Sequence, residues 1–160
     1  MGQLRVRPIA MNFSRRSRTM VAGSSPCSSV SASAIAAPAA AIVAGGSRCA
    51  PCFRLARWIE DHHATLDKDY VFVKLMDGID EHVTEALAGL PTKEGDGLPW
   101  FAITEPDGNV LAVSRGPMGN IGFPSSTEEI RHFRRMLEGT VRKMTSDDVD
   151  RLIKSLTAGQ

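Results

Sequence analysis

Two cysteines separated by two residues are the side chains of this chain best suited to carry chemistry. Cys49 and Cys52 form a C-x-x-C motif, whereas Cys27 stands alone in a Ser-rich run. The thiolate is the attacking form of a cysteine, and C-x-x-C motifs can lower a cysteine pKa from about 8.5 to roughly 3.5–7.5. We therefore expect Cys49 to be the thiolate that attacks a disulfide, and Cys52 to resolve the mixed disulfide that Cys49 forms.

The residues around the pair favour this chemistry. Apolar side chains recur at helical spacing and predict a helix that the motif opens and that runs to about residue 63: Cys52, Leu55, Ala56 and Ile59. The unpaired N–H groups of a helix N-terminus stabilise an anion placed there. Pro51 suits the first helical turn, where its missing N–H is not needed, and Arg48 adds a cation beside Cys49.

Half of a zinc site, or a pair of inert thiols, is the alternative interpretation of the motif. A structural zinc ion usually takes four ligands, such as a second C-x-x-C, and only Cys27 and scattered histidines remain to supply them. Redox chemistry is therefore the favoured interpretation. It requires no bound cofactor and no metal.

A second candidate element is Pro99, which comes directly before a predicted strand in the run Gly97-Leu98-Pro99-Trp100. The bond before a proline is the one peptide bond for which the cis form costs little, about 0.5–1 kcal/mol. A cis bond at Pro99 would present backbone groups to an extended substrate. We expect four residues to form the substrate-binding surface: Leu98, Pro99, Arg48 and Pro51.

The elements that must position these residues follow one another in a simple order. Composition and periodicity predict strands over residues 39–44, 70–76, 100–104 and 109–114, the last two joined by a turn at 105–108. Helices are predicted over 52–63 and 81–90, and two further helices open with capping boxes at Ser126 and Thr145. Residues 91–97 are expected to form a loop, and the Gly- and Pro-rich segment 116–124 to be irregular.

This order predicts an α/β fold with a central mixed sheet flanked by helices. The cysteine motif would follow its strand at the C-terminal end, where open α/β sheets place their sites. Residues 70–76 are nearly all apolar, which predicts a central strand buried on both faces. Lys74 is the lone charge in that strand, and we expect it either to be paired inside, where it could tune the dithiol, or to reach solvent.

The chain of 160 residues divides into two parts of opposite charge. Residues 1–58 contain eight Arg and no Asp or Glu, whereas residues 59–160 contain eleven Lys and Arg against eighteen Asp and Glu. The acidic part offers no broad phosphate-binding surface, so a nucleic-acid partner is not expected. No apolar run approaches the roughly 18 residues of a membrane span. We expect a monomeric domain at 39–160, preceded by a basic Ser- and Ala-rich extension at 1–38.

The extension at 1–38 has several interpretations. Its paired arginines at 15–16 and its small-x-small sites at 32–36 resemble a twin-arginine export signal, and its acid-free composition equally suits an organellar transit peptide. A disordered extension, or a start codon placed too early with Met11 or Met20 as later starts, are the other possibilities. A cleaved signal would make the protein exported, hence periplasmic, or organelle-targeted, and otherwise it would be cytoplasmic.

The sequence resembles the thioredoxin-like superfamily, and within it bacterial thioredoxin-family proteins of the thioredoxin-domain 7 type. The resemblance covers about residues 39–156 and is carried by the C-x-x-C motif, by Lys74 in its apolar strand, by Pro99 before its strand, by the turn at 106–108 and by the segment 120–124. It implies a thioredoxin fold, with Pro99 as a cis proline beside the nucleophile Cys49 and the resolving Cys52. Arg48 stands where family members commonly have Trp, and Val43 where many carry a buried acid.

These observations predict a thiol-disulfide oxidoreductase that reduces, forms or isomerises disulfides in protein or small-molecule substrates. Such a protein serves cell redox homeostasis and needs a thiol redox partner. The alternative is a non-catalytic thioredoxin-like interaction module that holds an extended segment beside Pro99. A third hypothesis is metal storage or transfer through the two thiolates. The reactivity of Cys49 and the presence of a bound metal distinguish the three.

Overall fold

The computed structural model describes residues 37–158, and within them the chain forms a four-stranded mixed sheet. The strands β1 (Ala39–Gly46), β2 (Tyr70–Asp77), β3 (Trp100–Thr104) and β4 (Val110–Val113) lie in the order β2-β1-β3-β4. β1 pairs in parallel with β2 and antiparallel with β3, and β4 returns antiparallel to β3. The α/β class and the mixed sheet expected from the element order are confirmed.

β1 is the strand from which the cysteine motif emerges, and its composition fits its place in the sheet. Its alanines are weak strand formers, but β1 has a hydrogen-bonded neighbour on each side. The strand continues to Gly46, two residues beyond the predicted end, because Gly45 and Gly46 pair with Met76 and Asp77. This extension carries the backbone to within three residues of Cys49.

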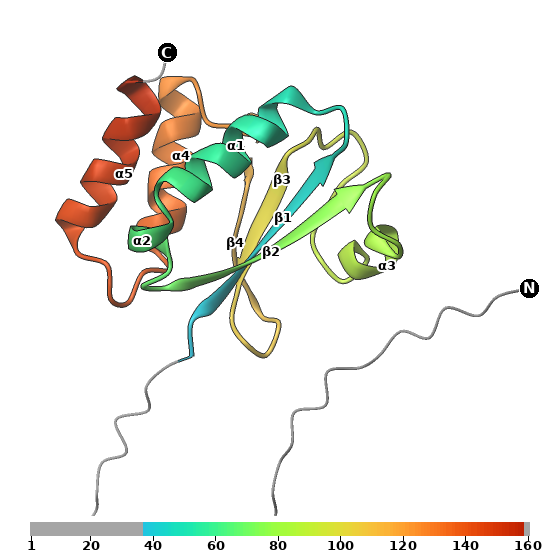
Figure 1. The fold of residues 1–160 in the computed structure, drawn as a ribbon, viewed down its shortest axis with the longest axis horizontal. Helices are drawn as coiled ribbons and strands as arrows, with labels where there is room; N and C mark the ends of the chain where they lie inside the picture. Colours follow the sequence, from blue (N-terminus) through green and yellow to red (C-terminus); the bar gives the residue numbers. More distant parts are fainter. Residues whose placement is uncertain (1–36, 159–160) are drawn as a thin grey trace, which may run out of the picture. The chain divides into compact units, whose positions relative to one another are not determined.

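One face of the sheet is covered by helices and holds the main core. The helices α1 (Ala50–Asp61), α2 (His63–Leu66), α4 (Thr127–Glu138) and α5 (Ser146–Ala158) lie together on this side in Figure 1. Alternate residues of the strands point toward these helices and form one buried cluster with helix residues. The cluster includes Ala39, Ala41, Tyr70, Phe101 and Ile103 from the strands and Leu55, Phe133 and Leu152 from the helices. Each such side chain contributes about 1.5–3 kcal/mol when fully buried.

Both capping boxes predicted for the last two helices are confirmed. Ser126 accepts a hydrogen bond from the amide of Glu129, whose carboxylate accepts from the amide of Ser126. Asp148 and Thr145 make the same reciprocal exchange before α5. Each cap supplies partners for helix N–H groups that have none inside the helix.

The opposite face is covered only in part, by α3 (Val83–Leu87) and the segment after it. A small cluster of Ala44, Trp100 and Ala102 is buried there beneath Leu87 and Leu90. α3 is shorter than the predicted helix over 81–90. It begins only at Val83, because His82 has φ 63° and so cannot be a residue of a right-handed helix, and it ends at Leu87.

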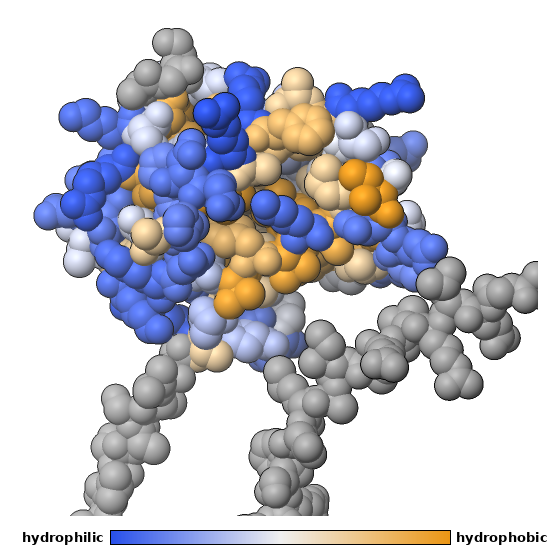
Figure 2. All heavy atoms as spheres, in the orientation of Figure 1, coloured by the Kyte–Doolittle hydropathy of each residue, from blue (hydrophilic) through white to orange (hydrophobic). Residues whose placement is uncertain are grey.

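The prediction that residues 70–76 form a central strand buried on both faces is wrong. β2 is an edge strand, and its Val71 and Val73 are 53% and 41% exposed. Both valines point to the partly covered face, on which the register also places Ile42 and Ala102. Figure 2 shows apolar residues gathered over the strands in the middle of the view, beside the mostly hydrophilic helices at its left.

The segment 116–124 is more regular than expected. Two short strands, β5 (Arg115–Gly116) and β6 (Gly119–Asn120), pair antiparallel to form a separate hairpin. Gly119 has φ 110°, a conformation that glycine adopts without a steric penalty, and it closes the tight turn. The targeting, disorder and start-site interpretations of residues 1–36, together with Cys27, lie outside the described residues.

Candidate active site

Cys49 and Cys52 form a disulfide at the junction between β1 and α1. Their sulfur atoms are 1.99 Å apart and their Cα atoms 5.2 Å apart, within the range of ordinary disulfides. The turn after β1 is closed by a hydrogen bond of 3.1 Å from the amide of Cys49 to the carbonyl oxygen of Gly46. The helix then begins at Ala50, so the motif opens a helix as the sequence predicts.

Cys49 is the N-cap residue of α1, and its sulfur takes the place that a Ser or Asp oxygen takes in other caps. The backbone N–H of Cys52 donates a hydrogen bond of 3.2 Å to Sγ of Cys49. The first turn contains Pro51, as expected, and no acidic residue. When the disulfide is reduced, this amide and the helix N-terminus favour the thiolate of Cys49 over its thiol.

The two cysteines differ in exposure. Cys52 is 7% exposed, whereas Cys49 is half-buried and reaches the surface. Cys52 lies against the end of β1 and β2: a Cβ atom at Gly45 would be 3.4 Å from its Cβ and 3.0 Å from Sδ of Met76. A substrate sulfur can therefore reach Cys49, while Cys52 can be reached only by its neighbour in the motif.

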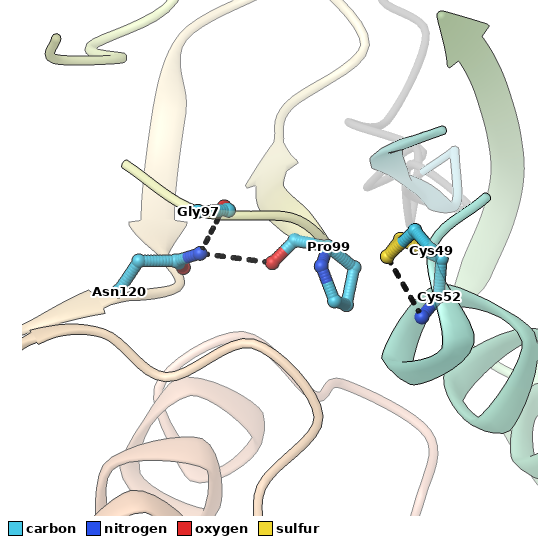
Figure 3. The surroundings of a disulfide bond; sticks show 5 residues. All are labelled: Cys49, Cys52, Gly97, Pro99 and Asn120. Atoms are coloured by element: carbon cyan, nitrogen blue, oxygen red, sulfur yellow. Dashed lines mark hydrogen bonds between the residues drawn. A yellow bond between two sulfur atoms is a disulfide. The ribbon is translucent and has the colours of Figure 1, made fainter. Parts of the chain in front are cut away.

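The Leu98-Pro99 peptide bond is cis, as the sequence-based hypothesis required. The antiparallel register pairs Trp100, the first residue of β3, with Ala44 near the end of β1, which brings the preceding loop to the disulfide. In Figure 3 the ring of Pro99 faces Cys49 and Cys52. A Cβ at Gly46 would be 3.2 Å from Cδ1 of Leu98 and 3.9 Å from Cβ of Cys49, so Leu98 also lies beside the motif.

Asn120 holds the loop that carries Pro99, and sequence reasoning did not single it out. Its Nδ2 donates to the carbonyl oxygens of Gly97 at 2.5 Å and Pro99 at 2.9 Å (Figure 3). Its Oδ1 accepts a bond of 2.7 Å from Oγ of the fully buried Ser114. These bonds bring the segment 116–124 beside Pro99.

The charged residues near the motif are exposed. Arg48 points into solvent next to Cys49, and the strand register places Asp77 opposite Gly46, so an anion faces this end of β1 as well. Lys74 lies opposite Val43 on the outer strand and is exposed, so of the two alternatives the charge paired inside is wrong and the charge that reaches solvent is confirmed. Among residues 37–158, no strand pairs with the outer edge of β2, which leaves Lys74 near the border of the sheet.

Two aromatic residues, Phe53 and Phe123, lie next to the start of α1. Phe53, directly after Cys52, is 56% exposed. The guanidinium of Arg54 lies 5.0 Å from the ring centre of Phe123, which ties α1 to the segment after the β5–β6 hairpin. An exposed aromatic side chain and a cation therefore follow Cys52 directly along α1.

Within residues 37–158 the structure contains no group of three or more His, Cys, Asp or Glu side chains that could hold a metal ion. No helix of that region is long and apolar enough to cross a membrane. Comparisons of the chain with protein-family models, with curated proteins and with solved structures found no match.

Proposed function

We propose that this protein is a thiol-disulfide oxidoreductase of the thioredoxin-like superfamily, with Cys49 as the nucleophile and Cys52 as the resolving cysteine. The observation that carries the proposal is the disulfide at the N-terminus of α1, in which Sγ of the half-buried Cys49 accepts a hydrogen bond from the backbone N–H of the buried Cys52. The sheet order β2-β1-β3-β4 and the cis bond at Pro99 beside the motif support the thioredoxin-like assignment.

Reduction of a substrate disulfide would take two exchange steps. The thiolate of Cys49 attacks one substrate sulfur, a mixed disulfide forms, and the other substrate sulfur leaves as a thiolate. The thiolate of Cys52 then attacks Sγ of Cys49, which releases the second substrate thiolate and closes the Cys49–Cys52 disulfide. Two electrons pass to the substrate, and a dithiol or thiol reductant of the cell must return them. Oxidation of a substrate runs these steps in reverse.

The loop at Pro99 supplies the surface for the substrate. Among the described residues, no hydrogen bond uses the backbone N–H or carbonyl oxygen of Leu98. These groups are therefore available to an extended segment next to the sulfur under attack. Arg48 and Pro51 are near neighbours of Cys49 along the chain, and the exposed charge of Arg48 acts on charged substrates most strongly at low salt.

Equilibration of the purified protein in glutathione redox buffers tests the proposal. We expect the Cys49–Cys52 disulfide to form reversibly, which mass spectrometry after alkylation of the free thiols detects. The redox potential at which half of the protein is oxidised identifies it as a donor or an acceptor of disulfides. The Cys27→Ser variant should give the same midpoint, because the third cysteine takes no part. If the pair stays reduced across the whole range, the proposal fails and the non-catalytic interaction module takes its place.

A further inference from the structure

The β5–β6 hairpin and the residue before it contact the loop of Pro99 at successive points. Arg115 and Asn120 are cross-strand partners in the hairpin. Arg115 forms an ion pair of 2.5 Å with Asp96, while Asn120 binds the carbonyl oxygens of Gly97 and Pro99. Every residue from 96 to 99 except Leu98 is therefore held by a side chain of this hairpin.

Ser114 connects these contacts to β3. Its Oγ accepts a hydrogen bond of 2.9 Å from the amide of Phe101 and donates to Oδ1 of Asn120. The donation fixes which end of the Asn120 side chain is the acceptor, so its NH₂ group must face the two carbonyl oxygens. Ser114 is fully buried and Asn120 is half-buried, and hydrogen bonds that pair all of the polar atoms of these two side chains favour a single arrangement of them.

The two acceptors of Asn120 belong to the residues on either side of Leu98. A single NH₂ group that binds both carbonyl oxygens fixes the backbone on each side of Leu98. The N–H and carbonyl of Leu98 itself take no part in the network, and its side chain lies beside Gly46 and the disulfide. The network thus sets the position of a free peptide segment relative to Cys49.

We infer that Asn120 is a positioning residue of the proposed oxidoreductase, which acts through Gly97 and Pro99 to hold Leu98 where a substrate backbone binds next to Cys49. The inference rests on the proposed function and adds to it the residue that shapes the substrate side of the site. It assigns Asn120 no contact with the reacting sulfur atoms. Its removal should impair reactions that need an oriented substrate and leave the intrinsic reactivity of Cys49 unchanged.

The test compares Asn120→Ala with Asn109→Ala in the Cys27→Ser background. Asn109 also donates its amide to a nearby acceptor, Asp107, but it lies in the turn after β3, at the end of the sheet away from the disulfide. Two reactions of the reduced proteins are followed. One is exchange with a peptide whose single cysteine is in a mixed disulfide with glutathione, and the other is alkylation of Cys49 by iodoacetamide, which needs no extended binding surface.

We expect Asn120→Ala to slow the peptide exchange roughly tenfold, through a higher KM, because small displacements of a positioning element are costly. Alkylation of Cys49 should stay as in the parent protein, and Asn109→Ala should match the parent protein in both reactions. Asn120→Asp keeps the size and the bond from Ser114 but replaces the NH₂ donor, so it should show the same pattern. This second variant carries the test if Asn120→Ala does not fold.

Three results overturn the inference. Peptide exchange equal to that of Asn109→Ala would mean that Asn120 only stabilises the fold. Slower alkylation in parallel with slower exchange would mean that Asn120 acts on the cysteine pair itself. If the parent protein exchanged the peptide disulfide no faster than its Cys49→Ser variant, the proposed function would fail together with the inference. This comparison therefore distinguishes failure of the proposed function from failure of the inference alone.

Discussion

The amide of Cys52 donates a hydrogen bond to Sγ of Cys49 across the first turn of α1, at 3.2 Å. The two cysteines are therefore connected by a hydrogen bond from backbone to sulfur as well as by the disulfide. Sγ of the half-buried Cys49 lies at the positive end of a helix that extends for twelve residues. An anionic sulfur at this position gains more from the amide than a neutral thiol does.

The reduced protein should therefore react through Cys49 at a pH where an ordinary cysteine is still protonated. We expect the rate of Cys49 alkylation to rise with a midpoint below about pH 8.5, the value of a free cysteine. Stopped-flow alkylation with mass spectrometry of the modified residue measures it. Cys52, buried behind Cys49, should be modified more slowly, and equal rates at the two cysteines would contradict the assignment of their roles.

Gly46→Ala should change the substrate surface while the fold is kept. The new Cβ would be 3.2 Å from Cδ1 of Leu98, the end of a side chain that can move, so only Leu98 must shift. We expect peptide exchange to slow about two- to tenfold. The control is Gly89→Ala, because no atom lies within 4 Å of a Cβ at Gly89. Equal rates of peptide exchange in the two variants would show that the position of the Leu98 side chain does not affect substrate binding.

The sequence was sufficient for features that depend on neighbours along the chain. The helix after the motif, Pro51 in its first turn and the caps at Ser126 and Thr145 all arise within about four residues, and all are confirmed. The strand before the motif was also recognisable from its apolar run at 39–44, although the structure extends it through two glycines to Gly46.

Features that depend on distant neighbours could not be read in this way. An apolar run such as 70–76 fits a central strand as well as an edge strand, and only the partly covered second face explains its exposed valines. Asn120 entered the sequence analysis only as the first residue of the segment 120–124 and was given no role, because its acceptors lie 21 and 23 residues away and a single Asn in a Gly-rich segment is ordinary turn chemistry.

Tyr70 provides a test of the packing between β2 and the segment after α4. Burial, aided by the nearby carboxylate of Asp69 and opposed by the hydrogen bond with Thr140, raises the pKa of Tyr70 to about 12. The folded state thus holds the phenolic proton more tightly than the unfolded state, so this contribution to stability is present below about pH 10 and is lost as the pH rises toward 12.

Because Tyr70 is the one tyrosine in the chain, the near-ultraviolet absorbance of tyrosinate reports on it alone. Tyr70→Phe should remove this signal. The variant should also lose less stability than the parent protein as the pH rises above about 10, because it has no phenol to ionise. At neutral pH it should cost about 0.5–1.5 kcal/mol for the lost hydrogen bond. A midpoint near pH 10 in the folded protein would contradict the burial of this hydroxyl.

The ionisation of Asp148 should make the free energy of unfolding depend on pH in the acidic range. Lys68, then the amide of Thr145, then Arg151 hold the pKa of Asp148 well below its usual range, against the opposing effect of burial. The folded state prefers the ionised form, so the contribution is present above about pH 4 and is lost as the pH falls below that value.

Asp148→Asn should lower the unfolding temperature at neutral pH, and its difference from the parent protein should shrink below about pH 4. Asp147→Asn is the matched control, since Asp147 lies exposed in the same first turn of α5. Thermal unfolding of the three proteins at several pH values makes the comparison. A constant difference across this range would mean that the ionisation of Asp148 is not what stabilises the fold.

The most direct test of the central claim is to trap the mixed disulfide. Cys52→Ser removes the sulfur that resolves the intermediate, so incubation of the reduced variant with a disulfide-bonded peptide should accumulate a covalent complex through Cys49. Cys49→Ser should accumulate none, because its remaining thiol is 7% exposed. Mass spectrometry of both variants with Cys27 replaced by Ser identifies the linked residue. A complex that forms through Cys52, or no complex in either variant, would contradict the account.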